Sequence, residues 1–234
     1  EIGANLGIGL DGDGDRVGVV DQNGKHYPAE YLIMMLSRDL LKNLPGEKVV
    51  FDVKVSNNLI NDIKNHGGQP IMSKTGHSFM EAKIKEQNAC LAGENSGHLF
   101  FGSRYYNFFG FDDGMFAACK VLEVLSKSNQ NFDEQFNGLP KLFSTPEMKA
   151  YCPDNRKFEI IKEISTSLSS KFDSITIDGI RINYDENSWG AIRCSNTTPC
   201  FTMRFEANTQ EKMETIKELF YAELRKYPEV KLPE

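Results

Sequence analysis

Apolar and polar positions alternate between strand-like and helix-like spacing over the first half of the chain. Short apolar runs predict strands at residues 6–11, 17–21, 48–53, 69–74, 89–94 and 98–104. Between them, amphipathic spacing predicts helices at residues 29–44, 56–68, 77–88 and 112–128. Strands that take turns with helices are typical of an α/β layer with a largely parallel sheet, and the first two strands should both be buried.

The pattern changes near residue 130. Residues 130–147 are polar, contain Pro140 and Pro146, and follow no regular period, so we expect a linker there. Beyond it, the spacing predicts a helix at about 155–171, a strand pair within 174–184, a strand and loop at 189–199, a strand at 200–207 and a closing helix at 210–225. The predicted fold class is α/β: a mixed α/β sheet-layer domain followed by a smaller α+β C-terminal domain.

Composition excludes several classes of partner. The net charge of −6 over 234 residues offers no basic surface for nucleic acid or an anionic membrane. No apolar run approaches the roughly 20 residues that span a bilayer. The five cysteines are scattered and lack a CxxC pair, which disfavours a disulfide framework or a zinc site. We therefore expect a cytoplasmic protein with neither nucleic acid nor membrane as partner.

The most charged segment, LDGDGDR, lies between the first two expected strands. Asp11, Asp13 and Asp15 alternate with glycines, which let the backbone bend so that the three carboxylates converge. Carboxylates that leave coordination positions open suit Mg²⁺, and Arg16 adds a positive charge for an anionic ligand. An EF-hand loop would need glycine in place of Arg16 and glutamate in place of Gln22. An acidic hairpin turn is the simpler alternative.

Three further polar segments follow expected strands. His77 stands at the start of a helix, where anions bind. Glu94, Ser96 and His98 alternate on a glycine-flanked loop and are placed to grip a polyol, although an ordinary hairpin tip has the same composition. Lys54 ends an apolar run, where a solvated lysine is the more common case.

A fourth polar segment, RCSNTTP, lies in the second half of the chain. Arg193, Ser195, Asn196 and Thr197 bring together a guanidinium, hydroxyls and an amide, which are groups that bind a phosphate monoester. A plain polar turn is the alternative. The sequence contains no G-x-x-x-x-G-K-[ST], so this segment is not a nucleotide-binding P-loop.

Taken in order, DGDGDR, DVK, KTGHSF, GENSGH and RCSNTTP closely resemble the motifs of the α-D-phosphohexomutase superfamily, and most of all its bacterial phosphomannomutase/phosphoglucomutase members. The resemblance runs over essentially the whole chain. It implies a four-domain isomerase, an intramolecular phosphotransferase that interconverts hexose 1-phosphate and 6-phosphate. The implied reaction passes through a phosphoserine enzyme and a bisphosphorylated sugar, in a cleft to which each domain contributes one loop.

The resemblance also implies cofactors and residue roles. Mg²⁺ is the implied cofactor, and hexose 1,6-bisphosphate is the intermediate and activator. The implied metal ligands are Asp11, Asp13 and Asp15. The implied catalytic residues are Arg16, Lys54 and His77, of which His77 is a candidate for proton transfer. The implied substrate-binding residues are Glu94, Ser96 and His98 for the sugar and Arg193, Ser195, Asn196 and Thr197 for the non-reacting phosphate.

By this resemblance, residues 1–25 are the end of the second domain with the metal loop, 26–135 the third domain, and 136–234 the fourth. No TASHNP-like segment, which holds the family's serine, occurs in the sequence, and the chain begins at Glu1 without an initiator Met. We therefore expect a C-terminal fragment that lacks its N-terminal domains and cannot turn over substrate alone. The alternatives are a phosphoglucosamine mutase, which tends to carry SGTEP where this chain has SNTTP, and a non-catalytic sugar-phosphate binding module.

Overall fold

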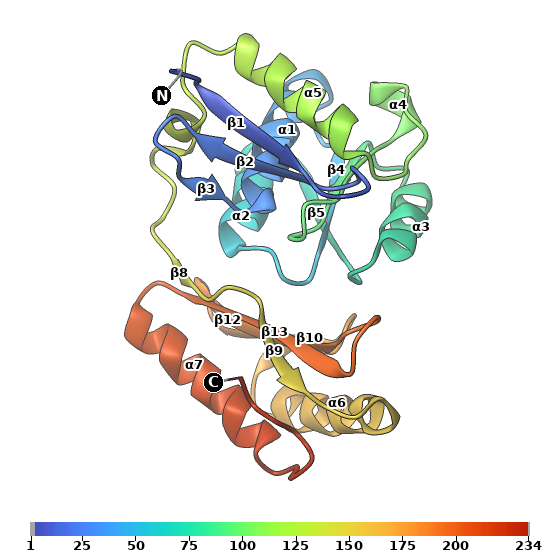
Figure 1. Ribbon diagram of the computed structural model, residues 1–234, viewed down its shortest axis with the longest axis vertical. Coiled ribbons are helices and arrows are strands. Elements are labelled where there is room, and N and C mark those ends of the chain that lie inside the picture. The colour runs from blue at the N-terminus through green and yellow to red at the C-terminus, as the bar shows by residue number, and fades with distance from the viewer. Residues whose placement is uncertain (1–2, 234) are drawn as a thin grey trace. The chain divides into compact units, whose positions relative to one another are not determined.

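The computed structural model describes residues 3–233, which divide into two compact units at Leu139 and Pro140 (Figure 1). The first unit contains a four-stranded sheet in the order β5-β4-β6-β7. Its strands are β4 (Lys48–Asp52), β5 (Gln69–Ser73), β6 (Leu91–Gly93) and β7 (Leu99–Phe101). β4 runs parallel to β5 and β6, whereas β7 is antiparallel to β6, so the sheet is mixed.

Helices cover both faces of this sheet. The helices concerned are α1 (Ala29–Asn43), α2 (Asn57–Asn65) and α3 (His77–Gln87). Side chains alternate between the faces of a strand. Val49 and Phe51 of β4 therefore join the core beneath α1 and α2, while Val50 packs against Met80 and Ile84 of α3. The result is a three-layer α/β/α arrangement in which the chain crosses from β4 to β5 and then past β4 to β6.

A second, antiparallel sheet carries the aspartate loop. It consists of β1 (Leu6–Leu10), β2 (Val17–Asp21) and β3 (His26–Tyr27), with α5 (Gly114–Ser126) packed on β1 and β2 (Figure 1). Val17 and Val19 of β2 are buried in the main core. No residue of β1 is fully buried and Leu10 is exposed, so the expectation of two buried strands is wrong for β1.

Two segments differ from their expected local structure. The strand expected over 98–104 ends at Phe101, and the short helix α4 (Ser103–Tyr106) follows it. The expected linker begins inside the core of the first unit. Phe132 and Phe136, at the 3₁₀ helix η1 (Asp133–Phe136), are buried there, and the Phe132 ring meets Tyr27 edge-on with centroids 5.1 Å apart. Because the residues around Phe132 and Phe136 in the sequence are polar, the pattern gave no indication that these two rings are buried.

The second unit is an antiparallel sheet with helices on one face. Its strands run in the order β10-β11-β12-β13-β8, and β9 also pairs with β13. They are β8 (Phe143–Ser144), β9 (Met148–Tyr151), β10 (Asp173–Ile175), β11 (Ile180–Asp185), β12 (Ser188–Cys194) and β13 (Cys200–Ala207). The helices α6 (Asp154–Ser169) and α7 (Gln210–Leu224) pack over the core. Among the residues described, no helix is both long and apolar enough to cross a membrane.

Candidate functional site

Polar loops gather where the parallel strands of the first sheet end. Parallel strands end at one edge, and ligands bind α/β sheets where successive connections diverge from a central strand. Here β4 is that strand, because β5 and β6 lie on its two sides. Lys54 follows β4, His77 follows β5 and Glu94 follows β6. The fold therefore brings three of the predicted residues to a single edge.

Asp52, the last residue of β4, contacts residues in the loops that follow β4, β5 and β6. One carboxylate oxygen accepts a hydrogen bond from Thr75 Oγ1 at 3.3 Å, and the other accepts one from the Asn95 N–H at 3.4 Å. Lys54 Nζ lies 3.7 Å from the first of these oxygens. Sequence reasoning missed Asp52. The available signal was an acidic residue at the end of an otherwise apolar strand.

Glu94, Ser96 and His98 point toward one another. The Glu94 carboxylate accepts hydrogen bonds from the Gly76 N–H and from Ser96 Oγ, the latter at 3.2 Å, and lies 3.0 Å from His98 Nδ1. Burial alone would raise the pKa of Glu94, but the hydrogen bonds from His98 and Gly76 and the nearby positive charges hold that pKa below its ordinary value. An ionised carboxylate only accepts hydrogen bonds, which suits it to bind hydroxyl groups.

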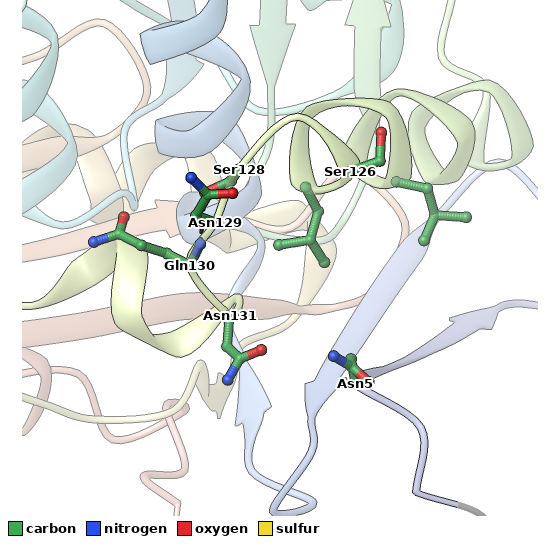
Figure 2. Close-up of a pocket in the computed structure, with 8 residues that line it drawn as sticks. Asn5, Ser126, Ser128, Asn129, Gln130 and Asn131 are labelled. Carbon is green, nitrogen blue, oxygen red and sulfur yellow. Dashed lines mark hydrogen bonds between the residues drawn. The ribbon is translucent and has the colours of Figure 1, made fainter.

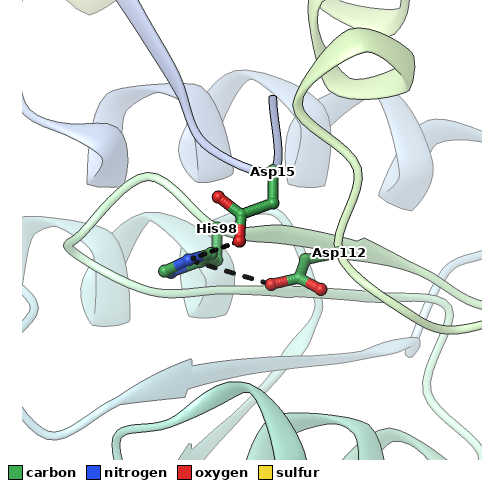
Figure 3. A group of neighbouring side chains, drawn as sticks. All are labelled: Asp15, His98 and Asp112. Carbon is green, nitrogen blue, oxygen red and sulfur yellow. Dashed lines mark ion pairs between the residues drawn. The ribbon is translucent and has the colours of Figure 1, made fainter. Parts of the chain in front are cut away.

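His98 connects this loop to the aspartate loop. Its Nε2 lies 3.4 Å from Asp15 Oδ2 and 3.9 Å from Asp112 Oδ2 (Figure 3). Burial would lower the pKa of His98, but Glu94, Asp15 and Asp112 together raise it, so the imidazolium form is favoured. Asp112 was also missed from the sequence, where it is the first acid of the DDG segment before α5.

The carboxylates of the aspartate loop converge. One oxygen from each of Asp11, Asp13 and Asp15 lies within 4.8 Å of the others. The Asp15 Oδ1 atom is buried without a hydrogen-bond partner. Oxygen donors with one unsatisfied atom fit a hard divalent cation. Asp15, His98 and Asp112 meet the same distance test, but only the three aspartates offer the all-oxygen ligand set that a hard cation prefers, so the first group fits better.

Arg16 forms ion pairs with two aspartates of the same loop. Its Nε lies 2.5 Å from Asp11 Oδ2 and 3.7 Å from Asp15 Oδ1, and half of its side chain is exposed. Although desolvation would raise the pKa of Asp11, the backbone and side-chain hydrogen bonds from Arg16 lower it. The guanidinium therefore stands at the rim of the carboxylate cluster, where an anionic ligand can compete for it.

Two glycines hold the aspartate loop in place. The Gly114 N–H donates to Gly14 O at 3.0 Å, and a Cβ on Gly114 would lie 2.7 Å from that oxygen and 2.8 Å from Arg16 O. On the other side, the Val17 N–H donates to Gly97 O at 3.2 Å, and Gly97 has φ +104°. The start of α5 thus approaches the loop as closely as backbone atoms permit.

Replacement of Gly114 by alanine should weaken metal binding, because the backbone of the loop has to shift to admit the methyl group. We expect Mg²⁺ affinity to fall by about tenfold, as for groups that orient metal ligands. Isothermal titration with MgCl₂ measures this. The control is Gly9→Ala in β1, outside the aspartate loop, whose Cβ would meet nothing within 4 Å. Equal affinity in both variants would show that α5 does not position the loop.

In the second unit, the predicted phosphate-binding residues lie at the end of β12 and in the 195–198 turn. Ser195 Oγ accepts hydrogen bonds from the N–H groups of Thr197 at 3.3 Å and Thr198 at 3.1 Å, which fixes the turn. Asn196 and Thr197 are exposed. Arg193 is buried, and its Nε donates to Asp178 Oδ2 at 2.6 Å. This ion pair orients the guanidinium beside the turn.

The first unit also contains a pocket of about 410 Å³ that is separate from the predicted site (Figure 2). It lies between Asn5, the end of α5 and the loop at 128–131. None of its lining residues is charged, and none belongs to the predicted site. Because a phosphate needs cationic partners, the loops described above are the better candidate site.

Comparison with known proteins identifies the family. Residues 28–143 match the family model for phosphoglucomutase/phosphomannomutase, alpha/beta/alpha domain III. The whole chain is 44% identical to a phosphomannomutase/phosphoglucomutase of Pseudomonas syringae pv. tomato, and 98% of it is 41% identical to a phosphoglucomutase of Neisseria meningitidis serogroup A. The chain spans 50% of the length of each of these relatives.

Solved structures agree. A phosphoglucomutase/phosphomannomutase family protein from Burkholderia thailandensis is 36% identical with a TM-score of 0.84, and the match covers 99% of this chain and 49% of that one. An N-acetylglucosamine-phosphate mutase of the α-D-phosphohexomutase superfamily shares the fold at 14% identity and a TM-score of 0.69. The resemblance drawn from the five motifs is therefore confirmed, and the chain belongs to the phosphoglucomutase/phosphomannomutase family.

Proposed function

We propose that this chain supplies the metal, sugar and phosphate sites of a phosphohexomutase that interconverts hexose 1-phosphate and 6-phosphate. The observation that carries the proposal is the edge of the first sheet, where the aspartate loop and the loops after β4, β5 and β6 meet. The names of the relatives favour mannose and glucose phosphates as substrates. Phosphoryl transfer depends mainly on positioning and on neutralisation of charge, and these loops provide both.

The aspartate loop is proposed as a magnesium site. Asp11, Asp13 and Asp15 would hold the ion, which when bound neutralises charge on phosphoryl oxygens. Arg16 would add a guanidinium beside the same phosphoryl group. This assignment agrees with the metal site that the resemblance implies, and we propose Mg²⁺ because hard oxygen ligands with open positions suit it.

The remaining residues of the first unit would bind and orient the sugar. Glu94 and Ser96 would accept and donate hydrogen bonds to hydroxyl groups, with His98 holding the Glu94 carboxylate in place. Lys54 would contribute positive charge. His77, at the first position of α3, is the proposed proton-transfer group.

The second unit would bind the phosphate that does not react. Arg193 would supply a charged donor, and Ser195, Asn196 and Thr197 would supply neutral donors from the turn. We retain the assignment of residues 1–25, 26–135 and 136–234 to the second, third and fourth family domains as part of this proposal. Because the sequence has no TASHNP-like segment, we expect the chain as given to bind hexose phosphates without turning them over.

Calorimetric titration with glucose 1-phosphate, mannose 1-phosphate and their 6-phosphates tests this proposal. The wild-type chain should bind them, and Glu94→Gln should weaken binding by about tenfold, because an amide replaces a charged acceptor. Glu123→Gln is the control, since that exposed glutamate of α5 pairs with Lys120 and Lys127, which lie outside the predicted site. No heat of binding in the wild type would refute the proposal, and equal affinity in Glu94→Gln would refute the sugar role of Glu94.

A further inference from the structure

Lys157 of α6 is a buried cation outside the predicted site. Its Nζ donates to Ser195 O at 2.8 Å and to Thr198 O at 3.2 Å, and it pairs with Asp154 Oδ1 at 2.7 Å. Lysine is rarely buried without partners, and here two of the three partners are carbonyl groups of the 195–198 turn. The side chain, which is 6% exposed, therefore spans from α6 to the back of that turn.

These hydrogen bonds determine the orientation of the turn's first peptide plane. In a trans peptide the C=O and N–H groups point to opposite sides, and the described residues contain no cis peptide bond. Because the Ser195 C=O points to Lys157, the N–H of Asn196 in the same plane points away from α6. Ser195 Oγ meanwhile binds the Thr197 and Thr198 N–H groups. The turn is thus held through both its carbonyl and its amide groups.

The same contacts place positive charge behind the turn. Lys157 lies in the first part of α6, where the helix dipole is positive. The Cys152 N–H donates to Pro199 O at 3.0 Å, which keeps the start of this helix against the turn. The side chain of Asp154 is 68% exposed, so solvent screens its opposing charge.

We propose that Lys157 is a positioning residue for phosphate binding by the 195–198 turn. Its ammonium group holds the turn in the conformation that receives a phosphate monoester, and it adds positive charge from behind. The inference rests on the proposed function of the turn. Lys157 itself lies beneath the backbone and acts through it, whereas Arg193 is proposed to contact the phosphate.

The test is a titration of the full chain with glucose 6-phosphate, followed through the ¹H–¹⁵N NMR signals of the Thr197 and Thr198 amides. These signals should shift saturably in the wild type. In Lys157→Met they should already differ before ligand is added, and affinity should fall by about tenfold, since hydrogen bonds to a charged group are lost. The matched control is Lys162→Met, which removes the same charge from an exposed position on the same helix and should bind as the wild type does.

Arg193→Ala separates this inference from the proposed function. Wild-type affinity in Lys157→Met, together with weak binding in Arg193→Ala, would overturn the role of Lys157 and leave the phosphate role of the turn intact. No saturable shift in the wild type would overturn both. If Lys157→Met does not fold, Lys157→Gln keeps an uncharged NH₂ donor group and should bind about threefold more weakly. Wild-type affinity in that variant would likewise overturn the inference.

Discussion

Asp13→Asn should reduce the affinity of the chain for Mg²⁺ on the order of 100-fold, because the amide replaces one of three anionic ligands of a hard cation. Asp13 is the most suitable of the three aspartates for this test. Asp11 also binds Arg16, and Asp15 also pairs with His98, so their replacement would disturb the loop as well as the metal site. Asp13 is exposed, and its replacement should leave the fold unchanged.

Isothermal titration with MgCl₂, with MnCl₂ as a second probe, gives the two affinities. Asp173→Asn is the control for net charge, because it removes one exposed carboxylate from the second unit. That variant should bind Mg²⁺ as the wild type does. If Asp13→Asn also binds Mg²⁺ normally, the segment is an acidic hairpin turn and the metal assignment fails.

Arg193→Ala should cost about 2–4 kcal/mol in the binding of a hexose 6-phosphate, since a charged donor to the phosphate is lost. Its ion pair with Asp178 orients the guanidinium, so the loss also leaves that carboxylate without this cation. In a protein of the relatives' full length, of which this chain spans 50%, the same variant should lower kcat/KM severely.

Calorimetry with glucose 6-phosphate measures the binding effect, and thermal unfolding shows whether the second unit remains folded. Arg156→Ala is the matched control. Arg156 lies on α6, and its side chain is 39% exposed and pairs with Glu159 and Glu229. Its replacement therefore removes the same charge without affecting the turn. An unchanged affinity in Arg193→Ala would argue against phosphate binding at this turn.

Local rules account for the elements that sequence analysis located well. The helix expected at 56–68 corresponds to α2 (Asn57–Asn65). Its start was predictable because Ser56 Oγ caps the helix by accepting a hydrogen bond from the Asn58 N–H at 3.1 Å. The glycine spacing of the aspartate loop likewise allowed its carboxylates to be expected together. Such features depend on residues a few positions apart, which a sequence displays directly.

Burial was harder to foresee. β1 and β2 have similar apolar sequences, yet only β2 places side chains fully inside the main core, whereas Leu6 and Ile8 of β1 are half-buried against it. Phe132 and Phe136 stand in a polar, aperiodic segment and are nevertheless core residues. Their burial depends on contacts with Tyr27, more than a hundred positions earlier, which no local period reveals.

Motif order, family and the residue types that each loop offers can be read from the amino-acid sequence alone. The side chains that orient those loops become apparent only in the folded chain. Asp52 binds a backbone amide 43 positions away, and Lys157 binds a carbonyl 38 positions away. Neither partner follows from spacing, because the two groups meet only after strand pairing and helix packing have set their relative positions.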